Sequence, residues 1–155
     1  MGGRELYLDT KYFGQISYEE GDILSFEDGV FGFIEEKRFL LLPFAGSEGA
    51  LLCLQSVQTP ELAFVVMDPF ALKPDYAPVL SPEELGAMGV EWSQELCFYV
   101  MCVVREPVAE STVNLKCPVV VNSDTRRAAQ VILETGEYQM RHRLSEFGPK
   151  EGGAC

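Results

Sequence analysis

Histidine is almost absent from this chain, because His142 is the only one in 155 residues. Zinc and non-haem iron sites usually draw on several histidines. A catalytic triad would have to use this single ring, and no GxSxG motif is present to supply a serine nucleophile. The phosphate-binding glycine loops GxxxxGK and GxGxxG are missing too. We therefore expect no catalytic residue, no metal and no cofactor, and we expect His142 to pack or to form surface hydrogen bonds.

Paired cysteine motifs are also missing. The chain has five cysteines, an odd number without any CxxC pair, which argues against both a disulfide framework and a zinc site. Cys97 and Cys102 would lie on opposite faces of one strand, because their spacing is odd. Core packing is the expected role of four cysteines, namely Cys53, Cys97, Cys102 and Cys117. Cys155 is expected to be exposed.

Long hydrophobic runs do not occur. The longest, Leu96 to Val104, is about half of the ~20 residues that a membrane-spanning helix requires. The first residues, MGGRELYLDTKYFG, contain no apolar stretch of the kind that secretory signals need. These features predict a soluble cytoplasmic protein with no membrane partner.

Positive charge is scarce. Twelve Lys and Arg oppose twenty-four Asp and Glu, which gives a formal charge of −12. Such a field repels nucleic acid and attracts cationic partners. The basic residues gather in two places, Arg126-Arg127 and Arg141-His142-Arg143, without the interleaved aromatics that single-stranded nucleic acid binding favours. We expect no direct nucleic acid binding.

Short apolar runs and turn residues fill the chain instead. From Ser111 to Leu133, two apolar runs flank the turn Asn122 to Thr125, and this pattern predicts a β-hairpin. About nine strands are expected, with no βαβ alternation. Ser81-Pro82-Glu83-Glu84 has the capping-box pattern and predicts the only helix, which should end near Gly89. The fold class is therefore all-β, a small antiparallel β-barrel-like domain with one short helix. The domain should span residues 1–144, followed by a mobile tail, 145–155.

The amino-acid sequences of four segments resemble one known family. They are TVNLKCPVVVN with TRRAAQVIL between Thr112 and Leu133, Thr10 to Gly14, Leu54 to Phe70, and Tyr138 to Leu144. In this order they resemble the flagellar assembly factor FliW family and cover nearly the full chain. The resemblance implies a β-barrel-like, non-enzymatic regulator that binds flagellin. It also implies that the protein binds and inhibits CsrA, an RNA-binding translational repressor, until accumulated flagellin captures it.

Two segments are candidates for partner binding. The proline-rich stretch after Met67 offers aromatic anchors among charges, at Asp68, Phe70, Lys73, Asp75 and Tyr76. Alternatively, Phe70 and Tyr76 tuck back into the end of the barrel. The second segment is Arg126-Arg127, which either pairs with carboxylates of this domain and holds the hairpin end, or contacts a partner. An unpaired strand edge could also accept a peptide.

Two other functions stay open. One is a flagellin-only chaperone without a role in RNA regulation. The other is a β-barrel enzyme that uses a surface carboxylate pair, for which Glu19-Glu20, Glu35-Glu36 and Glu83-Glu84 are the sequence neighbours. No heptad seam is present, and we expect a monomer.

Overall fold

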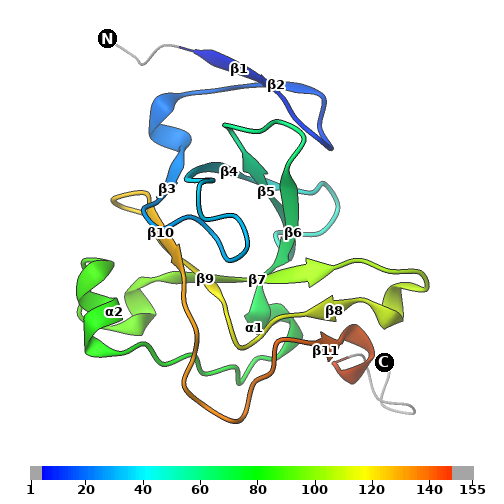
Figure 1. The fold of residues 1–155 in the computed structure, drawn as a ribbon. Coiled ribbons are helices and arrows are strands. Elements are labelled where there is room, and N and C mark those ends of the chain that lie inside the picture. The colour runs from blue at the N-terminus through cyan, green and yellow to red at the C-terminus, as the bar shows by residue number, and fades with distance from the viewer. Residues whose placement is uncertain (1–4, 148–155) are drawn as a thin grey trace.

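The computed structural model describes residues 5–147, which form a small barrel with attached strands (Figure 1). Within this range the chain contains eleven strands and two short helices. The strands are β1 (Leu6–Asp9), β2 (Gln15–Tyr18), β3 (Leu24–Phe26), β4 (Arg38–Pro43), β5 (Leu51–Ser56), β6 (Ala63–Met67), β7 (Cys97–Val103), β8 (Thr112–Val113), β9 (Val119–Asn122), β10 (Arg127–Gln130) and β11 (His142–Arg143). The helices are α1 (Pro69–Leu72) and α2 (Pro82–Ala87). The expected all-β class is confirmed.

Seven strands close into a ring. Their order is β7-β6-β5-β4-β3-β10-β9, and pairing of β9 with β7 completes the circle. The predicted hairpin is present as β9 and β10, where Arg127 lies opposite Asn122. The barrel departs from the expected antiparallel arrangement at one place, where β3 and β10 are parallel and Arg127 lies opposite Ser25. These two strands are far apart in the sequence, so no hairpin forces them to run in opposite directions.

Alternate residues of the ring face the barrel interior. Phe26, Phe39 and Val66 are fully buried there, and the Phe26 and Phe39 rings meet edge to face with centroids 5.2 Å apart. Each such side chain contributes about 1.5–3 kcal/mol when it leaves water completely. Residues on the opposite face, such as Val100 and Val120, pack into a second cluster with Leu80. The segment that contains α1 and α2 therefore covers one outer side of the barrel.

Both helices begin at residues that accept hydrogen bonds from the first turn. At α2, the Ser81 hydroxyl accepts from the Glu84 N–H at 3.1 Å and the Glu84 carboxylate accepts from the Ser81 N–H at 2.8 Å, so the predicted capping box is confirmed. The expectation of a single helix was wrong. Asp68 is the N-cap of α1, a single turn within the proline-rich stretch after Met67.

The apolar run after Ser111 is not one strand. It divides into β8 and β9, because the Asn114 side chain accepts hydrogen bonds from the N–H groups of Lys116 and Cys117 and holds a turn between them. β8 pairs with the C-terminal part of β7, and β9 pairs with its N-terminal part. The chain stays packed beyond Leu144, since Phe147 lies against the outer core cluster. Residues 148–155 of the expected tail lie outside the described range.

The cysteine prediction was wrong for Cys97 alone. Cys53 and Cys117 are buried, Cys102 is partly buried and packs against the outer core cluster, but Cys97 is exposed. Alternation along β7 explains the difference, because Cys97 and Cys102 face opposite sides as expected, and neither side is fully covered at these positions. Cys155 lies outside the described residues.

Candidate functional site

The segment Asp68 to Tyr76 is held firmly on the outside of the barrel. The Asp68 carboxylate accepts from the Phe70 N–H at 2.9 Å, which caps α1. After the turn, the Lys73 ammonium and the Asp75 carboxylate form an ion pair at 3.0 Å. The hydrogen bond between them raises the pKa of Lys73 and lowers that of Asp75, so both groups are charged at neutral pH. Four of the predicted partner-binding residues therefore lie together on a stiff, exposed turn.

The two aromatic residues of this segment differ in burial. Tyr76 is only 4% exposed, and its hydroxyl donates to the Leu115 carbonyl at 2.7 Å. Burial raises the pKa of Tyr76, so the hydroxyl keeps its proton. Phe70 is 40% exposed while one side of its ring packs on Tyr76 and Phe98. The alternative in which the aromatics tuck into the barrel end therefore holds for Tyr76, and Phe70 is left as the accessible anchor.

Two hollows flank the chain that follows Tyr76. The first, of about 500 Å³, lies between Phe70 and Leu96. The second, of about 550 Å³, lies beside the start of α2 and is lined by Glu84, Glu134 and Glu137. Val79 borders both hollows and is 74% exposed. We call these two hollows the acidic double hollow, because all the charged residues that line them are glutamates.

Sequence reasoning missed several residues of this surface. Val79 and Ile132 are large, apolar and exposed. Trp92, the only tryptophan in the chain, is also exposed and precedes Ser93, which lines the first hollow. A single tryptophan is itself a signal, because tryptophan is enriched among the residues that dominate binding energy. Glu134 and Glu137 gave no such signal, because only the packing of the segment after β10 places them beside α2.

Arg126 and Arg127 are not among the residues that line the acidic double hollow. They lie at the turn between β9 and β10, where Arg126 has a left-handed φ of 63°. The Arg126 guanidinium donates to the Asp22 carbonyl at 2.8 Å, and that of Arg127 donates to the Ala87 carbonyl at 2.7 Å. The predicted structural role is correct, but the acceptors are backbone carbonyls rather than carboxylates. These bonds tie the hairpin end to the chain before β3 and to the C-terminus of α2.

Tyr99 lies on β7 and is half-buried. Burial raises the pKa of its phenol, Cys97 and Asp68 add to the rise, and the positive charge of Arg126 opposes it. This residue was not singled out from the sequence, since a tyrosine in a strand is ordinary.

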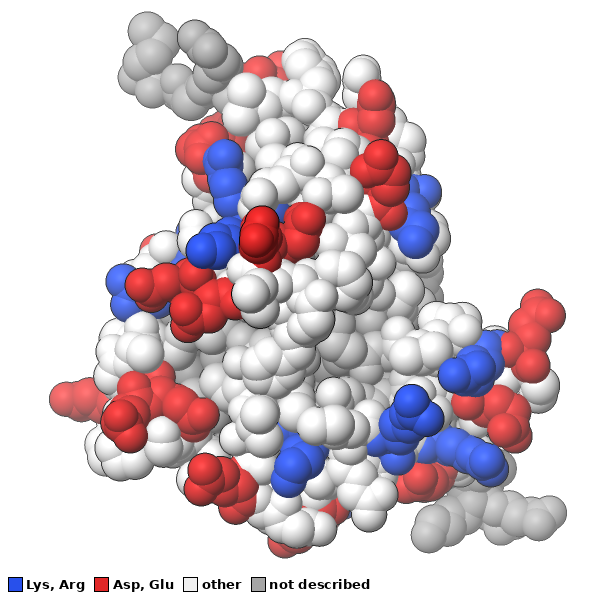
Figure 2. Space-filling view, in the orientation of Figure 1, with Lys and Arg blue, Asp and Glu red and all other residues white. Residues whose placement is uncertain are grey.

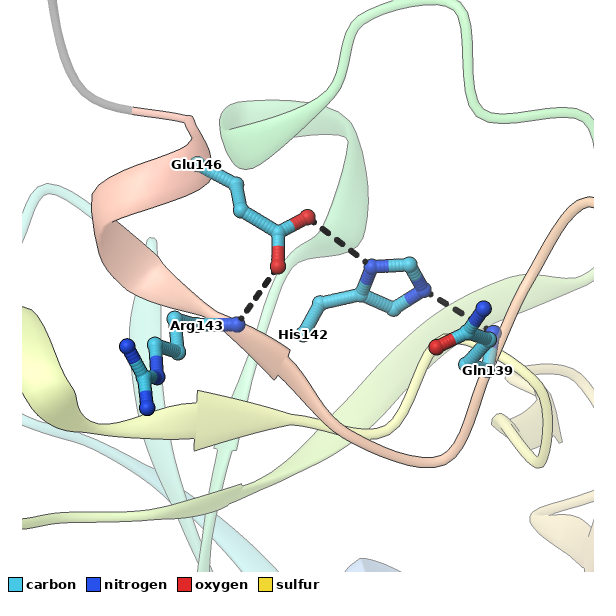
Figure 3. A network of polar contacts seen from close by, with 4 residues as sticks. All are labelled: Gln139, His142, Arg143 and Glu146. Carbon is cyan, nitrogen blue, oxygen red and sulfur yellow. Dashed lines mark hydrogen bonds and ion pairs between the residues drawn. The ribbon is translucent and has the colours of Figure 1, made fainter.

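His142 forms the hydrogen bonds expected of it (Figure 3). Its Nε2 accepts from the Gln139 N–H at 2.9 Å, and Nδ1 lies 3.1 Å from the Glu146 carboxylate. The same carboxylate accepts from the Arg143 N–H at 3.0 Å, and the bond to His142 lowers the pKa of Glu146. Both ring nitrogens are occupied by local partners, which leaves neither available to activate a nucleophile.

Between residues 5 and 147, no group of three or more His, Cys, Asp or Glu side chains is placed so that it could hold a metal ion. In the same range no helix is long and apolar enough to cross a membrane.

Comparison with known proteins gives one consistent result. The family model described as FliW protein matches residues 7–144. A flagellar assembly factor FliW of Geobacillus sp. (strain WCH70) is 42% identical over 137 residues, which cover 88% of this chain and 94% of that protein. The flagellar assembly factor FliW of Ruminiclostridium cellulolyticum is 38% identical over 91% of this chain and 95% of its own length. A crystal structure of the flagellar assembly factor FliW superposes with a TM-score of 0.82, at 40% identity, over 90% of this chain and 96% of that one.

Proposed function

We propose that this chain, which belongs to the FliW family and has a role in flagellar assembly, acts as a cytoplasmic regulator that binds two proteins. One is flagellin. The other is the RNA-binding translational repressor CsrA, which this protein would bind and inhibit. Flagellin that accumulates in the cytoplasm would bind this protein, so that the repressor stays active. Export of flagellin would release this protein, which could then inhibit the repressor. The protein performs no catalysis in this scheme and acts as a monomer.

The acidic double hollow is the observation that carries the proposal. An RNA-binding protein presents cationic surface to phosphate. This surface offers three glutamates beside the apolar Val79, and Phe70 lines the neighbouring hollow that Val79 also borders. Apolar anchors supply contact area, while the opposite charges speed association and set the orientation. The net charge of −12 would also repel RNA from a repressor held here.

Calorimetric titration with CsrA at about 0.02 M and about 0.15 M salt tests the proposal. We expect tighter binding at the lower salt, because salt screens exposed charges. Pre-formed complex with flagellin should bind no repressor. Heat from flagellin binding without any from the repressor would instead favour the flagellin-only chaperone.

A matched pair of variants tests the surface. Glu134→Lys places a positive charge in the acidic double hollow, and Glu35→Lys makes the same change of charge on the exposed β3–β4 loop. We expect Glu134→Lys to weaken repressor binding about tenfold, which is about 1.4 kcal/mol. Glu35→Lys should change it less than twofold. Equal losses would mean that net charge alone governs binding and that the acidic double hollow is not the docking surface.

A further inference from the structure

Strands β6 and β7 separate before either of them ends. Their pairing runs from Met67 opposite Val100 to Val65 opposite Cys102 and stops there. β7 continues beside β8, where Val103 lies opposite Thr112, while β6 continues beside β5, where Phe64 lies opposite Leu54. Figure 1 shows β6 turning away from the C-terminal part of β7. The facing edges of the two strands therefore carry no ladder partner beyond the last pair.

An apolar hollow of about 760 Å³ occupies this gap. Consecutive residues of both strands line it, from Ala63 to Val65 and from Met101 to Val104. Consecutive residues of a strand face opposite sides of a sheet, so a cavity lined by all of them opens at the place where the strands part. Tyr12 and Met140, both about half exposed, border it from other parts of the chain. We call this hollow the β6–β7 notch.

Several cations lie next in sequence to residues that line the notch, although the molecule is acidic as a whole. Four lining residues have a cation as their direct neighbour in sequence: Lys11 precedes Tyr12, Arg105 follows Val104, Arg141 follows Met140, and Lys116 precedes Cys117. The Lys11 ammonium lies 5.5 Å from the centroid of the Tyr12 ring, whereas the Lys116 ammonium donates to the Thr135 carbonyl at 3.3 Å. None of these four cations forms an ion pair within the described part of the chain. Figure 2 shows Lys and Arg atoms over the region of β8 and β11, with Asp and Glu atoms among them, beside a broad uncharged area.

We propose that the β6–β7 notch binds an extended apolar peptide segment of a partner protein that carries carboxylates at one end. Unpaired strand edges accept an added strand through main-chain hydrogen bonds, and pockets for alternate side chains give specificity. Here the walls are apolar and the charged group at the end of the segment meets Arg105 and Arg141. The ligand has the opposite charge to the one that suits the acidic double hollow. The inference does not depend on the proposed partners, because it uses only the chemistry of the notch.

Two fluorescent synthetic peptides test the proposal. Both contain an alternating Val-Thr segment of seven residues, and they end in Glu-Glu or in Lys-Lys. We expect fluorescence anisotropy titrations to show at least tenfold tighter binding of the Glu-Glu peptide at about 0.05 M salt. The preference should shrink at about 0.5 M salt, where charges are screened. Absence of binding at millimolar protein, or equal binding of both peptides, would overturn the proposal.

Variants locate the binding site. Val104→Asp and Met140→Asp each place a carboxylate at an exposed residue of the notch, and each should lower the affinity for the Glu-Glu peptide at least tenfold. Val79→Asp, at an exposed apolar residue outside the notch, is the control and should leave this affinity unchanged. Arg105→Glu should remove the preference for the Glu-Glu peptide, whereas Lys37→Glu, on an exposed loop, should keep it. Equal effects of the notch variants and their controls would contradict the assignment. Flagellin and CsrA are not used, so failure of the proposed function would not affect this result.

Discussion

At the scale of single residues, hydrogen bonds decide which aromatic side chains remain accessible. Tyr76 and Phe70 come from the same short segment, yet only Phe70 is exposed enough to meet a partner. The Tyr76 hydroxyl reaches the buried Leu115 carbonyl, and the neighbouring Tyr138 hydroxyl accepts from the Ala77 N–H at 2.9 Å. Each buried hydroxyl satisfies a backbone group that would otherwise lose a partner. Tyr76 therefore supports the candidate surface from below and does not form part of it.

Substitution Tyr76→Phe should lower the free energy of unfolding by about 1–3 kcal/mol, because the Leu115 carbonyl then stays buried without this donor. Denaturant titration measures the change. Tyr7→Phe is the matched control, since the Tyr7 hydroxyl bonds Glu5 at the surface and the side chain is 62% exposed. It should change stability by less than about 0.5 kcal/mol. A smaller loss at Tyr76 than at Tyr7 would mean that water replaces the bond.

At the scale of elements, the loop between β3 and β4 depends on one glycine. Gly29 and Gly32 both have positive φ, at 68° and 85°, where other residues are strained. Their surroundings differ. A Cβ at Gly29 would lie 2.4 Å from the Ile34 carbonyl oxygen, whereas one at Gly32 would meet open space. The close approach at Gly29 brings the loop back on itself, which lets Val30 bury its side chain.

Alanine at these two glycines should have unequal effects. Gly32→Ala should cost about 1–2 kcal/mol, which is the usual penalty for a left-handed conformation. Gly29→Ala adds a backbone collision and should cost at least about 3 kcal/mol, with a correspondingly lower Tm. Thermal unfolding of both variants under one condition compares them. Equal Tm values would show that the loop relaxes away from Ile34 at little cost.

At the scale of the whole molecule, charge is distributed unevenly. Glutamates line one part of the acidic double hollow, while Lys11, Arg105 and Arg141 are next in sequence to residues that line the β6–β7 notch. Two surfaces with opposite charge on one barrel suit partners of different chemistry. Both surfaces include residues of β7, since Phe98 lines the acidic double hollow and Met101 lines the β6–β7 notch. One continuous strand therefore connects them.

The excess negative charge should make stability depend on salt. At −12, mutual repulsion opposes the compact state, and raising NaCl from about 0.01 M to about 0.1 M shortens the Debye length from about 30 Å to about 10 Å. We expect Tm to rise over this range. The double variant Glu35→Lys, Glu61→Lys changes the charge by four, from −12 to −8, and should show a smaller rise. A Tm that falls with salt would mean that ion pairs outweigh repulsion.

The sequence alone determined the features that depend on neighbouring residues. The capping residues before α2, the hairpin of β9 and β10 and the all-β class follow from local pattern, and the family resemblance follows from ordered segments. These features rest on interactions between residues close in the chain, so a linear reading contains them.

Tertiary structure decided the features that depend on distant pairings. The closure of β7 on β9, the parallel contact of β3 with β10 and the early separation of β6 from β7 join segments far apart in sequence. The sequence does not specify which apolar strands pair, because each of them could pair with any other strand in a register that buries its apolar face. The β6–β7 notch arises from the early separation of β6 and β7, and the glutamates of the acidic double hollow meet only because the segment after β10 packs beside α2. Neither arrangement could be predicted from the sequence.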